Sequence, residues 1–115
     1  MKISMIRDGL EIGFDRDGAK LTVELKGRLD TSTSPELEEE LMPTLRGVKE
    51  LNMELSELDY ITSAGLRVLL VAAQTMEDQG EMTVWNPNSE VREVFEVTGF
   101  DTVLTIKPEA EGNDP

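Results

Sequence analysis

Residues 51–76 read LNMELSELDYITSAGLRVLLVAAQTM. In the first part, apolar residues alternate with polar ones at Leu51, Met53 and Leu55, which is the period of a β-strand with one buried face. After Ser63 the period changes to that of a helix, with the apolar residues Leu66, Leu69, Leu70, Ala73 and Met76 on one side. Residues 58–62 lead from the strand to a helix start at Ser63, and Gly80 is the expected stop. This stretch therefore predicts a strand that runs directly into an apolar helix, the basic unit of an α/β fold.

The residues before this unit predict a β-hairpin and a helix. Leu10, Ile12 and Phe14 alternate with polar residues, and the alternation returns after Asp17-Gly18 at Leu21, Val23 and Leu25. A short extra strand around Ile3 and Met5 is a further possibility. The run Thr31-Ser32-Thr33-Ser34-Pro35 predicts the start of a helix that Gly47 closes.

The residues after the central unit predict a strand, a third helix and a possible last strand. Met82 and Val84 mark the strand, Asn88 or Ser89 can cap a helix that Gly99 ends, and residues 103–106 fit a short strand. The fold class is thus α/β: one domain over residues 1–107, with a mixed, mostly parallel sheet of four to five strands, an N-terminal β-hairpin and three main helices. Residues 108–115 read as a disordered acidic tail.

Composition excludes several classes of function. A net charge of −13 would repel a nucleic acid or an anionic membrane surface. No apolar run approaches the roughly 20 residues that span a bilayer, and the N-terminus does not read as an export signal. The chain has no Cys and no His, so we expect no metal site and no cofactor built on those ligands. These observations predict a cytoplasmic protein that binds neither nucleic acid nor membrane.

Ser63 is the residue at which chemistry is most readily placed. It stands at or next to the N-terminus of the central helix, where free backbone N–H groups and the helix dipole tolerate a phosphate. A phosphoryl group would add about −1.5 to −2 charge there. The plainer interpretation is that Ser63 only caps the helix. A hydrolase is disfavoured, since the nearest carboxylates are Glu57 and Asp59 and no His can serve as a base, so we expect no enzymatic activity.

Two other features have ordinary structural explanations. The acidic run at residues 36–40 reads as the solvated side of a helix, because consecutive helical residues point in different directions. The few large aromatic residues, Trp85, Phe95 and Phe100, are expected in the core.

Residues 60–70, YITSAGLRVLL, resemble the signature of the STAS domains of bacterial anti-sigma factor antagonists, in which a phosphorylatable Ser precedes a small residue, Gly and Leu. Gly27-Arg28-Leu29-Asp30 resembles the family's motif before the first helix. Residues 81–87 and 91–100 resemble its fourth strand and final helix.

The resemblance implies an anti-sigma factor antagonist that binds an anti-sigma factor, usually a serine kinase, and so frees a sigma factor. Phosphorylation of Ser63 by the kinase would break the complex, and a serine phosphatase would restore it. The partner-binding surface implied by matching position comprises Asp30, Thr31, Ser32, Thr62, Ser63, Ala64, Gly65 and Arg67.

One departure from the family pattern leaves alternatives open. Thr62 stands where characterised antagonists commonly have Asp. Thr62 could itself be modified, or the chain could be a STAS domain that is not phosphorylated, either a scaffold in a signalling complex or a subunit associated with a lipid or anion transporter. Asn52, where many relatives have an apolar residue, suggests a less buried face of its strand.

Overall fold

The computed structural model describes residues 2–108. The helices and strands, in chain order, are β1 Lys2–Arg7, β2 Leu10–Asp17, β3 Lys20–Leu29, α1 Ser34–Thr44, β4 Glu50–Ile61, α2 Ser63–Glu77, β5 Glu81–Trp85, α3 Ser89–Thr98, the 3-10 helix η1 Phe100–Thr102 and β6 Ile106–Lys107.

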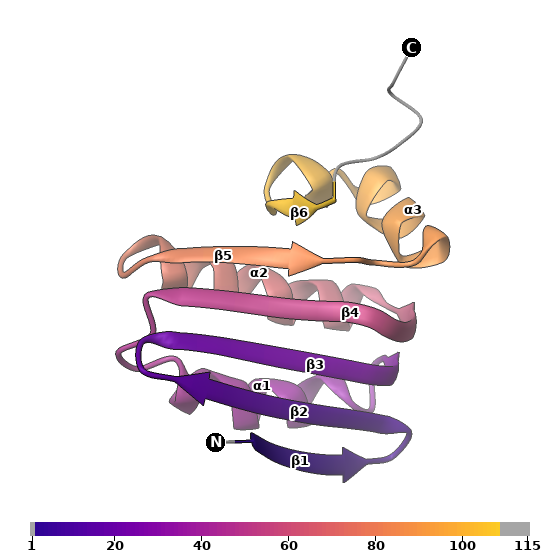
Figure 1. Cartoon of the computed structure of the whole chain (residues 1–115). Coiled ribbons are helices and arrows are strands. Elements are labelled where there is room, and N and C mark those ends of the chain that lie inside the picture. Colours follow the sequence, from indigo (N-terminus) through magenta and orange to yellow (C-terminus); the bar gives the residue numbers. More distant parts are fainter. Residues whose placement is uncertain (1, 109–115) are drawn as a thin grey trace.

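The strands form one sheet in the order β1-β2-β3-β4-β5-β6, so that neighbours in the sheet are neighbours in the chain (Figure 1). β1, β2 and β3 are antiparallel, whereas β3, β4, β5 and β6 are parallel. The predicted α/β class, mixed sheet, hairpin and three helices are confirmed. The sheet has six strands and not four or five: β1 pairs along its whole length with β2, and β6 pairs through two residues with β5. The last strand predicted at residues 103–106 lies instead at Ile106–Lys107, because Val103 ends η1 and the Leu104 N–H donates to the Phe100 carbonyl.

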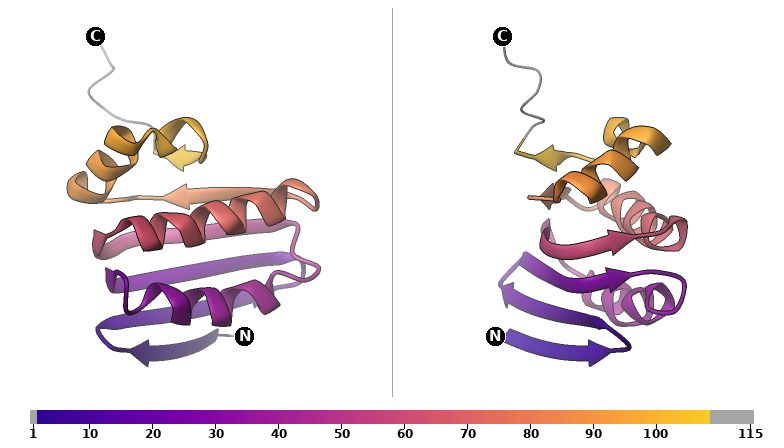
Figure 2. Two further views of the ribbon diagram at one scale, coloured as in Figure 1. Left: turned by 180° about the vertical axis from the view of Figure 1, so that it is seen from behind. Right: turned by 90° about the vertical axis from the view of Figure 1, so that its right-hand side faces the viewer.

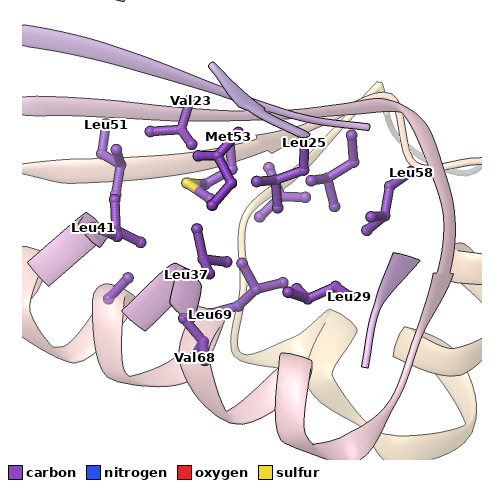
Figure 3. Close-up of a cluster of buried hydrophobic side chains, with 14 of the residues drawn as sticks. Val23, Leu25, Leu29, Leu37, Leu41, Leu51, Met53, Leu58, Val68 and Leu69 are labelled. Carbon is purple, nitrogen blue, oxygen red and sulfur yellow. The ribbon is translucent and has the colours of Figure 1, made fainter. Parts of the chain in front are cut away.

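The domain has two layers. α1 and α2 cover one face of the sheet, and no helix within residues 2–108 covers the opposite face (Figure 2). Between sheet and helices lies a core of fully buried side chains, among them Val23, Leu25, Leu37, Leu41, Leu51, Met53, Val68 and Leu69 (Figure 3). The alternation of Leu21, Val23 and Leu25 with polar residues sends every second side chain into this core.

The end of β4 is irregular where it approaches the candidate site. Its pairing with β3 passes from Glu24 opposite Glu54 to Lys26 opposite Glu57, so β4 contains an extra residue there, and a second irregularity follows before Tyr60. Such bulges bend a strand and re-aim its side chains. As a result, residues 58–61, which the sequence indicated only as a connection, are the last part of one twelve-residue strand.

α3 is held by its caps and by a hydrogen bond to β4. Asn88 Oδ1 accepts a hydrogen bond from the Val91 backbone N–H at 2.8 Å, and Asn88 Nδ2 donates to the Leu58 carbonyl at 3.0 Å. Gly99 ends the helix in the left-handed conformation. The predicted cap and stop of this helix are therefore confirmed.

Two expectations about burial need correction. Trp85 is not part of the core: it projects from β5 on the uncovered face and is 37% exposed, while Phe95 is fully buried and Phe100 partly buried. Asn52 lies on that face too, yet it is only 8% exposed, because the Trp85 indole bonds to it. Of the predicted tail, all but Pro108 lies outside the described residues.

Candidate functional site

The candidate site lies at the edge of the sheet where β3 and β4 end. Leu29 pairs with Ile61 at this edge, and the Thr62 N–H donates to the Leu29 carbonyl at 3.0 Å. α1 begins just after β3, and α2 follows β4 with only Thr62 between them, so both helix N-termini lie at the same edge (Figure 2). This is the edge of a parallel sheet at which ligands and partners usually bind.

Asp30 organises the connection from β3 to α1. Its Oδ1 accepts hydrogen bonds from the Ser32 and Thr33 backbone N–H groups at 2.9 and 3.1 Å. The Thr33 hydroxyl donates to the Arg28 carbonyl at 2.9 Å and accepts from the Asp30 N–H at 2.9 Å. Thr33 is fully buried, whereas Thr31 and Ser32 are exposed. The loop therefore presents Thr31 and Ser32 on a backbone that the Asp30 carboxylate holds in place.

The same bonds shift the acidity of Asp30. The Thr33 backbone N–H is the largest influence that lowers the pKa of Asp30 below its ordinary value of 3.8, and the Ser32 N–H, the Thr33 hydroxyl and Arg28 act in the same direction against partial burial. The charged carboxylate is thus the form that the folded loop favours.

This shift predicts the pH dependence of an Asp30→Asn variant. Because the folded pKa lies below the unfolded one, the stabilisation by Asp30 is complete above the unfolded value, near 3.8, and is lost as the pH falls through the folded value. The difference in unfolding free energy between parent and variant should therefore be largest at pH 7 and shrink towards pH 3. Urea unfolding at several pH values measures it. Asp78→Asn, at an exposed residue after α2, controls for the loss of one charge; a difference for Asp30→Asn that does not change with pH would contradict the prediction.

Ser63 is the first residue of α2 and is exposed. The residue at the N-cap is Thr62, whose side chain makes no cap hydrogen bond and whose Oγ1 is buried without a partner. The first-turn N–H groups are thus not capped by this side chain, which favours an anion at Ser63. Arg67, also exposed, follows Ser63 by four residues and so shares its side of the helix.

Gly65 serves the site through packing and not through surface contact. It is buried, and a Cβ built on it would lie 2.7 Å from Leu29 Cγ and 2.9 Å from Ile61 Cγ1. Glycine therefore lets the first turn of α2 approach the ends of β3 and β4, which sets the position of Ser63. Ala64 is only partly buried and borders the exposed Ser63.

Two further residues beside the site were not among the predicted ones. Arg28 and Tyr60 are opposite each other on β3 and β4, and the Arg28 guanidinium lies 4.8 Å from the centre of the Tyr60 ring. Arg28 Nε is also 3.5 Å from Asp30 Oδ2. Tyr60 is 45% exposed, so the pair forms a cationic and aromatic surface next to the Asp30 loop. The signal in the sequence was the strand alternation, which sends Leu29 and Ile61 inward and their neighbours outward.

Glu57, one of the two carboxylates considered for a hydrolase, pairs with Lys26 at 3.6 Å. Within residues 2–108 no three acidic side chains gather closely enough to hold a metal ion. No helix in the described part of the chain is long and apolar enough to cross a membrane.

The mixed sheet with two helices on one face and the serine at the start of α2 agree with the resemblance to STAS domains. The family described as "Mlab, STAS domain" matches residues 12–106. The chain belongs to the STAS domain family.

Similar proteins are named as anti-sigma factor antagonists. One is BtrV of Bordetella bronchiseptica, 37% identical over 84% of this chain and 85% of BtrV. Another is the anti-sigma-B factor antagonist of Bacillus subtilis, 26% identical over 80% of this chain and 85% of the relative.

Solved structures share the fold. An anti-sigma factor antagonist of Mycobacterium paratuberculosis superposes with a TM-score of 0.79 at 19% identity, over 90% of this chain and 89% of the other. SpoIIAA in its unphosphorylated form gives 0.74 at 19% identity, over 88% and 91%. A phosphorylated form of SpoIIAA, from Bacillus, is also known and gives 0.66 at 18% identity, over 88% and 95%.

Proposed function

We propose that this chain is an anti-sigma factor antagonist whose complex with an anti-sigma serine kinase is ended by phosphorylation of Ser63. The observation that carries the proposal is the exposed Ser63 at the first position of α2, on the same edge of the sheet as the Asp30 loop. The relatives named as anti-sigma factor antagonists support the class of partner.

The partner-binding surface in this proposal combines exposed and partly buried residues of that edge. It comprises the Asp30 loop with Thr31 and Ser32, then Thr62, Ser63 and Ala64, and Arg67 one turn further along α2. Gly65 contributes by letting α2 pack closely on the sheet. The loop and the helix start are rigid, because the Asp30 carboxylate and the close packing at Gly65 fix them. A rigid surface loses little conformational entropy when it binds.

A phosphoryl group on Ser63 would act on the complex and not on the fold. It adds about −1.5 to −2 charge to an exposed position, so it does not have to be buried in the free domain. The positive end of α2 stabilises it there by about 0.3–1 kcal/mol. In a complex, the same group would occupy the contact surface and repel acidic groups of the partner. Phosphorylation thus favours the free domain, and a serine phosphatase would reverse the effect.

The domain acts by binding and has no turnover of its own in this proposal. Its sites are exposed side chains on one edge, its partner is a protein, and it requires neither metal nor cofactor. We infer a cytoplasmic location, because the kinase needs intracellular ATP and its sigma factor is bound to the transcription machinery.

Intact-mass spectrometry tests the proposal. The parent chain and Ser63→Ala are incubated with ATP and the candidate anti-sigma kinase from the genome that encodes this chain. We expect one phosphoryl addition to the parent and none to the variant. Complex formation with the kinase in the absence of ATP is measured in parallel. Failure of the unmodified parent to bind the kinase would overturn the proposal.

A second candidate is a STAS domain that docks without being phosphorylated, as a scaffold or as a transporter-associated subunit. Thr62 favours it, since a buried hydroxyl stands where a carboxylate is common in the family. Tight binding of the kinase with no mass change on either chain would indicate this candidate. Phosphorylation that persists in Ser63→Ala and disappears in Thr62→Val would assign the switch to Thr62.

A further inference from the structure

Trp85 is an aromatic side chain held in a fixed orientation on the uncovered face of the sheet. Trp85, at the end of β5, is 37% exposed. Its indole Nε1 donates to Asn52 Oδ1 at 2.8 Å, and Asn52 Nδ2 donates in turn to Glu50 Oε2 at 3.0 Å. Because the indole N–H is already bonded inside the protein, what Trp85 offers to a partner is the surface of its ring.

A shallow, open depression of about 250 Å³, called the hollow below, lies beside this ring. Its lining consists of Lys20, Thr22, Glu50, Asn52, Glu54 and Trp85. The Glu54 carboxylate is held in place, since its Oε2 accepts from the Ser56 N–H at 3.1 Å and both its oxygens lie within 3.3 Å of Asn86 Nδ2. Asn86 has a φ of 56°, a left-handed backbone conformation that is uncommon outside glycine. The hollow thus combines an aromatic surface with two positioned carboxylates.

The charges around the hollow favour a cation. Strand register places Glu24 and Glu54 in the row of Trp85, and Glu50 and Glu81 in the row of Lys20. These four carboxylates outnumber the cations in the same two rows, Lys20 and Lys107. Lys26, two residues beyond Glu24, pairs with Glu57 at 3.6 Å. A planar guanidinium can stack on an indole and pair with carboxylates at the same time, which an ammonium does less well.

We propose that the hollow beside Trp85 is a second docking site, which receives an arginine side chain from a basic segment of a protein partner. Its lining residues lie on the sheet face opposite α1 and α2, because they alternate along the strands with core residues such as Val23, Met53 and Val84. None of them belongs to the Ser63 surface. Both surfaces can therefore be occupied together. The inference does not depend on phosphorylation of Ser63.

Trp85 is the only tryptophan of the chain, so its fluorescence reports on this site alone. The probe is a blocked peptide, acetyl-Gly-Arg-Gly-Arg-Gly-amide, compared with peptides of the same length that carry lysine or the neutral isostere citrulline. We expect a saturable change in emission with the arginine peptide, binding about threefold weaker with lysine, and no saturable change with citrulline.

Variants separate this site from general attraction to an acidic protein. The double variant Glu50→Gln, Glu54→Gln keeps the size of both side chains but removes their charges. It should weaken binding of the arginine peptide about tenfold. Glu39→Gln with Glu93→Gln, at exposed positions on α1 and α3, removes the same charge elsewhere and should change binding less than twofold. Three results would each overturn the proposal: an equal loss of affinity for the arginine peptide in both double variants, equal affinity of the parent for the citrulline and arginine peptides, or no saturable change in Trp85 emission of the parent. Ser63→Asp should leave peptide binding intact, so a failed kinase experiment and a failed peptide experiment remain distinguishable.

Discussion

The Ser63→Asp variant is expected to bind the anti-sigma kinase about 100-fold more weakly than the parent, or worse. A fixed negative charge in the centre of a contact surface must be desolvated, and it repels any carboxylate that faces it. Asp carries less charge than a phosphoryl group, so it sets a lower limit on the effect of phosphorylation. Titration calorimetry with purified kinase and no ATP measures the change directly.

Two further variants show whether the effect belongs to that position. Ser63→Ala should bind within about threefold of the parent, because it removes only an exposed hydroxyl. Gln74→Glu adds one negative charge at an exposed position of the same helix, about 16 Å further along its axis, and should leave binding almost unchanged. Near-parental binding of Ser63→Asp would contradict the proposed switch and favour the docking scaffold.

Replacing Gly65 by Val should lower the free energy of unfolding by about 3 kcal/mol. The first added carbon already lies 2.7 Å from Leu29 Cγ, and the further methyl groups have no free volume beside the buried Leu29 and Ile61. α2 must then move away from the ends of β3 and β4, which also displaces Ser63. Urea unfolding gives the stability, and kinase binding well below the unfolding transition gives the effect on the site.

Gly13→Val is the matched control for this substitution. Gly13 lies on β2, and a Cβ there would meet only Glu24, at an ordinary contact distance of 3.7 Å or more. Valine also suits a strand, so the unfolding free energy should change by less than about 0.5 kcal/mol. If both variants lose the same stability, the close approach at Gly65 is not the cause.

The fold could be predicted from the sequence wherever a periodic pattern of apolar residues extends over many residues. The change from period two to helical spacing across Ser63 defines β4 and α2, and the caps Asn88 and Gly99 define α3. The position of the last strand could not be predicted, because β6 consists of two residues and so short a strand carries no periodic signal. The bulges of β4 were not predictable either, since they shift the register without changing the composition of the strand.

At the candidate site, the sequence predicted where residues lie in the fold better than which side chains contact one another. It indicated that Ser63 would begin a helix and that Asp30 would precede another, and both lie at one edge of the sheet. It did not indicate that Arg28 stacks on Tyr60, because that contact depends on the register between two strands. Trp85 was misplaced for a related reason. Aromatic residues are usually buried, but the alternation of β5 had already assigned Val84 to the core and its neighbour to the other face.

The order of the strands in the sheet also bears on how the chain folds. Since each strand lies beside the one before it, the sheet can grow from its N-terminal edge as the chain leaves the ribosome, and no strand has to be inserted between two that are already paired. Only short turns connect β1, β2 and β3, so this meander can form first with a small loss of chain entropy. Each later strand then follows a helix in the chain and pairs with the edge strand that has already formed.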